Sequence, residues 1–297
     1  MHMNTRVRPG DALADQLNDG LVFAPGCYDC LSAAVLEGEG APAIFVSGAG
    51  IAASSAGLPD LGLTSLTELL TSAGNIIARS AVPIIVDGDN GFGNELNTAR
   101  TVEAIGRLGA AAVMIEDQVF PKRCGHLEQK AIVSRDEYER KLRVALDICD
   151  EFGMLLIART DSLAVEGIEE SAARVELAHD LGAHITFVDA PRDQSDVERI
   201  GGLPGMKMYN IATGSSTPSL PFRDLHDMGF NLVIEPCVSL YPAIDGIRRA
   251  YRSVVDAGSA APLKSFGMKP RDIFESVGLN SWLEIDGAAS RSARSGR

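Results

Sequence analysis

Eight short apolar segments recur along the chain, and each ends in small or polar residues. Their side chains are apolar almost continuously rather than at every second position, which is typical of parallel strands buried on both faces. Most of the segments are separated by enough residues to form a helix. The segments cover residues 21–25, 43–47, 82–87, 111–116, 154–159, 184–189, 206–210 and 231–235.

The intervening segments have helical periodicity, which is clearest in 97–108 and 135–150. Three glycines follow such segments where helix C-caps are expected: Gly109, Gly153 and Gly182. Eight strand–helix units predict an α/β fold of the (β/α)8 type, a TIM barrel. The alternative is a doubly wound open sheet, which requires a Gly-x-Gly-x-x-Gly turn after its first strand. Residues 24–29 lack that turn, so the barrel is favoured.

Charge and apolar content exclude several classes of protein. The chain has 27 basic and 40 acidic residues, and its formal net charge of −13 predicts a surface that repels nucleic-acid phosphates and anionic lipids. No apolar run approaches the roughly 20 residues of a membrane-spanning helix, and the N-terminus lacks the apolar stretch of a signal peptide. The five cysteines are scattered and form no disulfide pattern. We therefore expect a cytoplasmic protein without nucleic-acid or membrane partners.

The C-terminal part of the chain departs from the strand–helix repeat. Residues 262–270 begin and end with proline, and 271–286 predict one more amphipathic helix. The segment 287–297 is rich in Ser, Arg and Gly, so we expect it to be disordered. The predicted organisation is a catalytic barrel over 1–262, a C-terminal helical segment over 263–286 and a tail over 287–297.

Acidic residues gather at the carboxyl ends of the predicted strands, where the active site of such a barrel lies. Carboxylates around one mouth repel each other unless a cation neutralises them, and oxygen ligands suit Mg²⁺ or Mn²⁺. The pattern therefore predicts a metal site. Any single residue of this kind could instead cap the helix that follows. The acidic residues at or just after strand ends are Asp87, Asp89, Glu116, Asp117, Asp161, Asp189 and Glu235.

The loop after the fourth predicted strand contains Lys122, Arg123, Cys124 and His126. The two cations and the histidine are expected to lower the pKa of the Cys124 thiol, which would make it a proton donor or nucleophile near neutral pH. A small loop that contains a glycine can also close over a ligand. By spacing alone, a cysteine near a histidine is more often incidental than functional.

Two motifs resemble those of the isocitrate lyase and phosphoenolpyruvate mutase superfamily, namely Asp87-Gly88-Asp89-Asn90-Gly91-Phe92-Gly93-Asn94 and Pro121-Lys122-Arg123-Cys124-Gly125-His126. The resemblance continues, in the same order and at similar spacing, through 57–62, 158–161 and 210–218. The second motif resembles the carbon–carbon lyases of this superfamily, such as those acting on 2-methylisocitrate and 2,3-dimethylmalate. The resemblance implies a magnesium-dependent lyase that cleaves a 2-hydroxy di- or tricarboxylate. The alternatives are a phosphonomutase and an oxaloacetate-type hydrolase on the same scaffold.

The resemblance also implies roles for particular residues. The metal, Mg²⁺ or alternatively Mn²⁺, would be held mainly by Asp87 and supported, partly through water, by Asp60, Asp89 and Glu116. The substrate carboxylate beside the reacting carbon would be held by Ser47, Gly48, Ala49 and Arg159, because guanidinium binds carboxylate in a bidentate manner. The remote part of the substrate would meet Asp189, Asn210 and Thr217.

Cys124 would protonate the departing carbanion, and Lys122, Arg123 and His126 would set the charge state of its thiol. The implied assembly is a homotetramer in which neighbouring subunits exchange the segment 271–286. The small-molecule partner is the carboxylate substrate.

Four positions depart from the lyase pattern. Phe45 replaces a tyrosine that is a candidate base, and Asn90 replaces a threonine. Asp189 and Thr213 both stand where glutamate is usual, which predicts a remote pocket with less negative charge and a different substrate preference.

Overall fold

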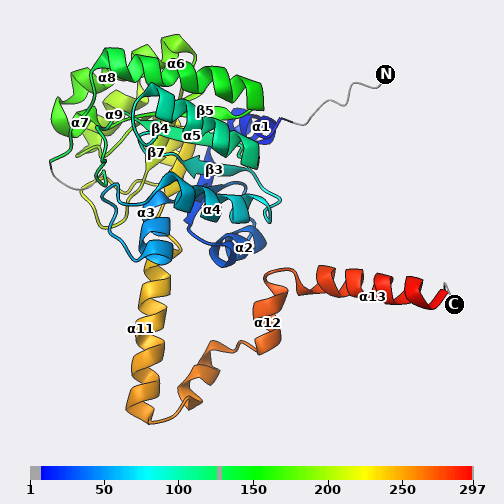
Figure 1. Ribbon diagram of the computed structural model, residues 1–297. Coiled ribbons are helices and arrows are strands. Elements are labelled where there is room, and N and C mark those ends of the chain that lie inside the picture. Colours follow the sequence, from blue (N-terminus) through cyan, green and yellow to red (C-terminus); the bar gives the residue numbers. More distant parts are fainter. Residues whose placement is uncertain (1–7, 126–128, 296–297) are drawn as a thin grey trace.

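The computed structural model describes residues 8–125 and 129–295, and these form a closed barrel of eight parallel strands surrounded by helices (Figure 1). Each strand pairs with the next in sequence, and β8 pairs with β1 through the register Val22↔Leu232 to Pro25↔Glu235. The predicted TIM barrel is thus confirmed. The strands are β1 (Val22–Cys27), β2 (Ile44–Val46), β3 (Ile84–Asp87), β4 (Ala112–Glu116), β5 (Leu155–Thr160), β6 (Ile185–Val188), β7 (Met206–Asn210) and β8 (Leu232–Glu235).

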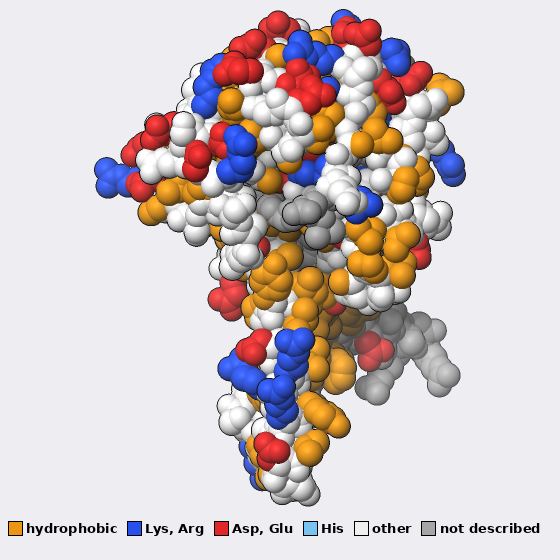
Figure 2. Space-filling view, turned by 90° about the vertical axis from the view of Figure 1, so that its left-hand side faces the viewer, with side chains coloured by type: hydrophobic (Ala, Val, Ile, Leu, Met, Phe, Trp, Pro, Cys, Tyr) orange, Lys and Arg blue, Asp and Glu red, His pale blue; other side chains and the backbone are white. Residues whose placement is uncertain are grey.

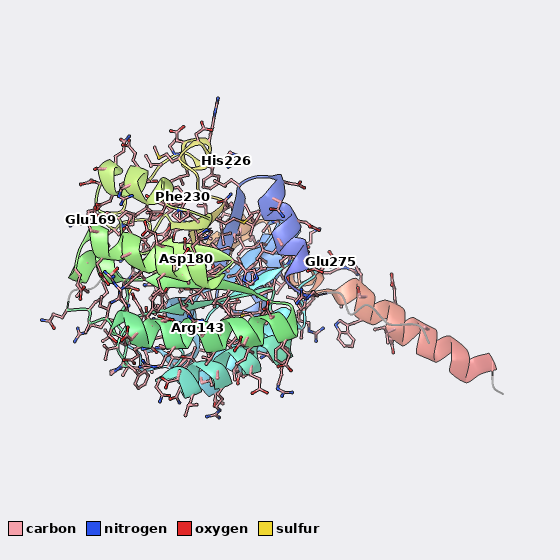
Figure 3. The ribbon with its side chains drawn as sticks, turned by 90° about the horizontal axis from the view of Figure 1, so that it is seen from above. Arg143, Glu169, Asp180, His226, Phe230 and Glu275 are labelled. Atoms are coloured by element: carbon pink, nitrogen blue, oxygen red, sulfur yellow. The ribbon has the colours of Figure 1, made fainter. Side chains whose placement is uncertain are left out.

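Helices connect the strands and cover the outside of the barrel. Gly109, Gly153 and Gly182 end three of them in the left-handed region, with φ of 90°, 67° and 98°, as the sequence predicted. In the view from above, Arg143 on α6 and Asp180 on α8 lie on neighbouring helices (Figure 3). The helices are α1 (Asp11–Asp19), α2 (Cys30–Gly38), α3 (Gly48–Ile51), a π-helical turn (Ala52–Ala56), α4 (Leu66–Ile77), α5 (Glu95–Leu108), α6 (Arg135–Phe152), α7 (Ser162–Val165), α8 (Ile168–Leu181), α9 (Gln194–Gly201), α10 (Phe222–Asp227) and α11 (Leu240–Ala257).

The interior of the barrel is packed with side chains. Alternate residues of the strands point inward, among them Phe45, Met114 and Phe187, and helix α1 closes the amino-terminal end with Leu13 and Leu17. The intervening residues pack outward against the helices. Because apolar side chains fill the barrel from below, a substrate can enter only at its carboxyl-terminal mouth.

Beyond the barrel, the chain forms an extended arm of α11, a 3-10 turn (Ala261–Phe266), α12 (Pro270–Glu275) and α13 (Leu279–Ser295) (Figure 1). No residue of α11 is buried, and apolar side chains are visible along this part of the molecule (Figure 2). None of the helices in the described segments is both long and apolar enough to cross a membrane.

One expectation for the C-terminal part needs correction. The single helix expected over 271–286 is divided, because Gly278 adopts a left-handed φ of 90° between α12 and α13. Helix α13 then runs from Leu279 to Ser295.

Candidate active site

A cavity of about 1120 Å³ opens at the carboxyl ends of the strands. It receives side chains from β2, β3, β4, β5, β6, β7 and β8 and from the loops that follow them. Many of the residues singled out from the sequence line it: Ala49, Asp60, Asp87, Lys122, Cys124, Arg159, Asp189 and Asn210. The fold therefore brings together residues that lie far apart in the chain.

Lys122 lies among the acidic residues on one side of this mouth. Its Nζ is 2.5 Å from Asp60 Oδ1 and 2.8 Å from Asp89 Oδ1. Burial alone would lower the pKa of the Lys122 ammonium, but Asp89 and Asp60 hold this pKa well above its ordinary value. Lys122 is therefore a permanently charged part of the site.

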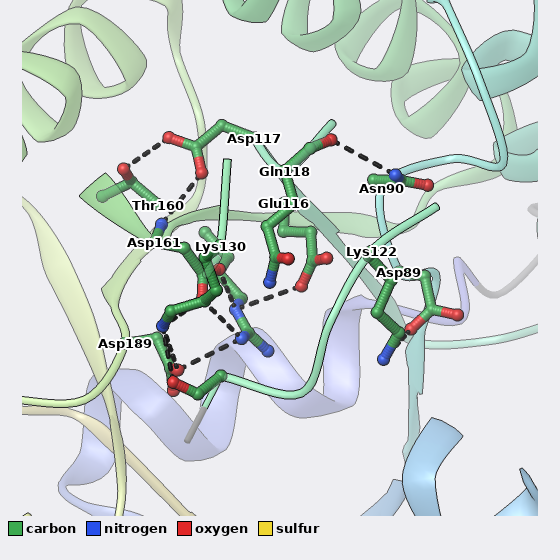
Figure 4. Close-up of polar contacts among 12 residues, drawn as sticks. Asp89, Asn90, Glu116, Asp117, Gln118, Lys122, Lys130, Thr160, Asp161 and Asp189 are labelled. Atoms are coloured by element: carbon green, nitrogen blue, oxygen red, sulfur yellow. Dashed lines mark hydrogen bonds and ion pairs between the residues drawn. The ribbon is translucent and has the colours of Figure 1, made fainter. Parts of the chain in front are cut away.

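Arg159 is the cation on the other side of the mouth, where it contacts Glu116, Asp161 and Asp189. Figure 4 labels these three acidic residues. Its Nε lies 2.8 Å from Asp161 Oδ2 and 3.3 Å from Glu116 Oε2, and its Nη2 lies 3.2 Å from Asp189 Oδ2. Burial opposes the charged form, but these carboxylates keep the pKa of Arg159 well above its ordinary value. Arg159 thus holds three acidic side chains in fixed positions at the ends of β4, β5 and β6.

The carboxylates of the mouth are not fully neutralised by these cations. Burial, followed by repulsion from Asp89, raises the pKa of Asp87 to about 6. Burial likewise raises the pKa of Glu116 well above its ordinary value, although Arg159 opposes the shift. The ionised forms of both carboxyl groups are therefore destabilised in this site, and a further cation would stabilise them.

The loop carrying Cys124 is seated against this charged cluster. The Cys124 amide donates to Asp60 O at 3.1 Å, and the side-chain amide of Gln118 holds the backbone of Arg123 with two hydrogen bonds of 2.9 Å. Gly125 lies so close to Asp189 and Arg159 that a Cβ there would overlap the Asp189 carboxylate. Residues 122–125 are thus seated against the charged cluster, and Cys124 lines the cavity.

The remaining predicted residues occupy varied positions. Ser47 is buried, and its Oγ accepts from the Gly50 amide at 3.1 Å. Thr217 is buried, and its Oγ1 has no hydrogen-bond partner among the described residues. The Arg123 side chain is exposed, so only its backbone belongs to the site as described. His126 lies outside the described residues.

Two supporting groups, Lys130 and Asp117, were given no role from the sequence. Lys130 donates from Nζ to Gly125 O at 2.5 Å and to Asp161 Oδ1 at 3.0 Å, so it ties the Cys124 loop to β5. Asp117 is fully buried behind the mouth and accepts from the Asp161 amide at 2.8 Å and from Arg174 Nη1 at 3.0 Å. Only the place of Asp117 at a strand end signalled its importance, because its partner Arg174 comes from the middle of a helix.

Thr213 lies at the remote wall of the cavity, against Glu235. The carboxylate of Glu235, at the end of β8, accepts from Thr213 N at 2.9 Å and from Thr213 Oγ1 at 2.7 Å. A buried carboxylate therefore lies against Thr213, although residue 213 itself carries none. Residues 213 and 235 are separated in the sequence, so this contact could not be predicted from it.

The donor set at the mouth fits a hard divalent cation. All candidate ligands are oxygens, and Glu116 Oε1 is buried without a hydrogen-bond partner among the described residues. A Cβ at Gly48 would lie 3.1 Å from Asp87 Oδ2 and 3.3 Å from Asp89 Oδ1, so the glycine leaves open the space beside both carboxylates. Among the described residues, no three acidic, histidine or cysteine side chains form a ready-made ligand set. The site therefore fits a divalent cation that is bound directly by few protein residues and whose remaining ligands are water and substrate oxygens.

The raised pKa of Asp87 predicts a pH-dependent effect of Asp87→Asn on metal-free protein. Between its ordinary pKa of 3.8 and the folded value of about 6, the folded state binds more protons than the unfolded state, so this group lowers stability as pH rises. The variant lacks this penalty but keeps an oxygen that can accept from the Asp89 amide. The difference in unfolding free energy, variant minus wild type, should increase by about 1–3 kcal/mol between pH 4.5 and pH 7.5.

Urea denaturation in the presence of a chelator measures this difference, with the exposed Asp15→Asn as control. An equal difference at both pH values would contradict the assignment.

The chain is similar to a known protein family and to characterised proteins over most of its length. The family model described as phosphoenolpyruvate phosphomutase matches residues 13–255. The chain is 36% identical to 2,3-dimethylmalate lyase of Eubacterium barkeri, over 96% of this chain and 98% of that protein. It is also 36% identical to the chloroplastic carboxyvinyl-carboxyphosphonate phosphorylmutase of Arabidopsis thaliana, over 90% of this chain and 80% of that protein.

Among solved structures, an oxaloacetate acetylhydrolase in complex with 3,3-difluorooxalacetate superposes with a TM-score of 0.91. The two sequences are 33% identical, and the alignment covers 95% of this chain and 97% of that chain. These matches extend over the whole barrel and agree with the motifs at its mouth. The chain therefore belongs to the phosphoenolpyruvate phosphomutase family, within the phosphoenolpyruvate mutase and isocitrate lyase superfamily.

Proposed function

We propose that the protein is a magnesium-dependent carbon–carbon lyase that cleaves a 2-hydroxy di- or tricarboxylate, of the alkylmalate or methylisocitrate type, into an oxoacid and a carboxylic acid. The observation that carries this proposal is the combination of a thiol, a fixed guanidinium and an excess of carboxylates in one cavity. The match to 2,3-dimethylmalate lyase over nearly the full length of both chains supports it. The superfamily is metal-dependent, and the oxygen donors described above fit Mg²⁺.

Asp87 would hold the magnesium directly, and Asp60, Asp89 and Glu116 would support it partly through water. When bound, this ion would stabilise negative charge that develops on the oxygens of the reacting molecule. Arg159 engages carboxylates through Nε and Nη2, so in the described part of the chain Nη1 remains available to a substrate carboxylate. The backbone over 47–49 would hold that carboxylate from the opposite side. These contacts fix the bond to be broken between C2 and C3.

Cys124 would protonate the carbanion that forms as this bond breaks. The loop contacts described above hold its backbone beside Asp60. Closure of the loop over a bound substrate would exclude water from the reactive fragment. Lys122 would stabilise the negative charge near the thiol. Phe45 has no proton-accepting atom, so another group of the cavity must take the proton of the 2-hydroxyl.

The exposed C-terminal arm indicates how the subunits assemble, and the cysteines indicate where the protein is located. The arm carries apolar side chains that are at least half exposed in the single chain: Ile247, Tyr251, Val255, Phe266, Phe274 and Leu283. We assign the protein to a homotetramer in which neighbouring subunits exchange these arms, because burial between subunits would remove this apolar surface from water. None of the five cysteines forms a disulfide, which is consistent with the reducing cytoplasm.

The lyase is tested by incubating the protein with Mg²⁺ and each of several candidate substrates. We expect 2,3-dimethylmalate or 2-methylisocitrate to release pyruvate, with propionate or succinate in equal amount, and we expect exhaustive chelation to abolish release until Mg²⁺ is restored. Two alternative functions have support among the relatives, the acetylhydrolase structure and the phosphorylmutase. Cleavage of oxaloacetate alone, or rearrangement of a carboxyphosphonate alone, would replace the lyase with the corresponding alternative. Full activity after chelation would contradict the metal.

Substitution of Cys124 by serine tests the proton donor. Serine keeps the size of the side chain but is a far weaker acid, so the variant should bind substrate with a nearly unchanged KM and lose at least about 100-fold in kcat. Steady-state kinetics on the cleaved substrate measure both constants. The buried Cys149→Ser is the control, because this thiol lies on α6 away from the cavity. A kcat near that of wild type in Cys124→Ser would exclude the thiol as the donor.

Substitution on the exposed apolar face of α11 tests the assembly. Ile247 is 70% exposed in the single chain, so Ile247→Gln should leave the isolated barrel intact but weaken an interface formed by this face. Sedimentation should show wild type at four times the 31.4 kDa mass of one chain and the variant at lower mass. The neighbouring Arg248→Gln should remain tetrameric. Wild type sedimenting as a single chain would contradict the assignment.

A further inference from the structure

One wall of the cavity is formed by the segments that follow β7 and β8. Residues 210–216 supply Asn210, Ala212 and Thr213 to this wall. Strand β8 supplies Ile234 and Glu235, and the turn after it supplies Cys237. The wall lies across the barrel mouth from β4, where Glu116 ends its strand. It is therefore the part of the cavity that meets the end of the substrate remote from the metal.

The Glu235 carboxylate connects the two segments of this wall. Its Oε2 accepts from Thr213 N at 2.9 Å and from Thr213 Oγ1 at 2.7 Å, and its Oε1 accepts from Cys237 N at 3.1 Å. Glu235 is only 6% exposed, so these are hydrogen bonds in a poorly solvated environment, where charge-assisted bonds are strongest. One side chain thus fixes the loop after β7 to the loop after β8.

The loop after β7 depends on such an anchor. Ala212 has a φ of 45°, which is an unfavourable conformation for a residue with a Cβ. The Ala212 amide donates to Asn210 Oδ1 at 3.1 Å. The amide of the following residue, Thr213, donates to the Glu235 carboxylate. Without the Glu235 carboxylate, the strained residue would be followed by an amide and a hydroxyl with no acceptor, and the loop would relax.

The hydrogen bonds of Glu235 also determine what this wall offers to a substrate. Its two oxygens already receive three donors from the protein, so the carboxylate contributes buried negative charge and little capacity to accept from a ligand. The other polar side chains of this wall are neutral, namely the NH₂ of Asn210 and the hydroxyls of Ser215 and Ser216. Such a wall accommodates one remote carboxylate or an alkyl group, and it repels additional negative charge.

We propose that Glu235 is a positioning and specificity-determining residue of this enzyme: it anchors the loop after β7 and makes the cavity select 2-hydroxy diacids with alkyl substituents over tricarboxylates. The inference rests on the proposed lyase function for its substrates, but the anchoring stands on the hydrogen bonds alone. The residue acts through Thr213 and Cys237 rather than by contact with the reacting atoms.

Two measurements on full-length protein test the anchor and the selectivity separately. In Glu235→Ala, hydrogen exchange of the Thr213 and Cys237 amides should become about tenfold faster, because both lose their acceptor. The ratio of kcat/KM for 2,3-dimethylmalate to that for 2-methylisocitrate should fall at least about tenfold, mainly through KM for the diacid. Glu235→Gln keeps one acceptor oxygen and should give intermediate values for both. The exposed Glu176→Gln on α8 is the control and should match wild type.

A paired substitution distinguishes a specific contact from general damage to the wall. Thr213→Glu alone places a second carboxylate against Glu235 and should raise KM for the diacid more than tenfold. When Thr213→Glu is combined with Glu235→Gln, a neutral amide donor at 235 faces a carboxylate at 213. The double variant should therefore recover most of the increase in KM caused by Thr213→Glu alone. Additive losses in the double variant would overturn the proposal, as would unchanged exchange or an unchanged substrate ratio in Glu235→Ala. If wild type cleaves neither substrate, the proposed function fails, and exchange of the two amides decides whether Glu235 anchors the wall.

Discussion

The site depends on an imbalance of charge at the mouth of the barrel. Six acidic side chains meet there, Asp60, Asp87, Asp89, Glu116, Asp161 and Asp189, against three cations, Lys122, Lys130 and Arg159. Each cation is shared between at least two carboxylates, so its position is determined by several contacts. The remaining negative charge raises the pKa of Asp87 and Glu116, which links the architecture directly to the need for a divalent cation.

The same ion pairs connect the metal region to the thiol. Lys122 and Lys130 lie on opposite sides of Cys124 in the sequence, and both are fixed by carboxylates outside their own loop, Asp60, Asp89 and Asp161. The loop is therefore held by charge at both ends, while Asp117 and Arg174 brace β4 and β5 from behind. A cluster built in this way positions the reacting groups before the substrate arrives, which reduces the reorganisation that the reaction requires.

Much of this arrangement could be predicted from the sequence, because strand ends in a parallel barrel share one mouth. The eight apolar segments located the strands, and their terminal residues located Asp87, Glu116 and Arg159. Contacts that depend on three-dimensional neighbours could not be found in this way. The pairing of Glu235 with Thr213 joins two different strand ends, and the break at Gly278 depends on a backbone angle that glycine permits but does not require.

The most direct measurement of the central claim is cleavage of 2,3-dimethylmalate in ²H₂O, followed by NMR of the products. In the proposed reaction, cleavage of the C2–C3 bond leaves a carbanion at C3, and an exchangeable thiol protonates it. In ²H₂O this carbon, which becomes C2 of propionate, must therefore receive one deuteron. The account therefore predicts pyruvate and propionate in equal amounts, with a single deuteron at C2 of the propionate. Propionate without deuterium, or unchanged 2,3-dimethylmalate under conditions in which the protein splits oxaloacetate into oxalate and acetate, would contradict it.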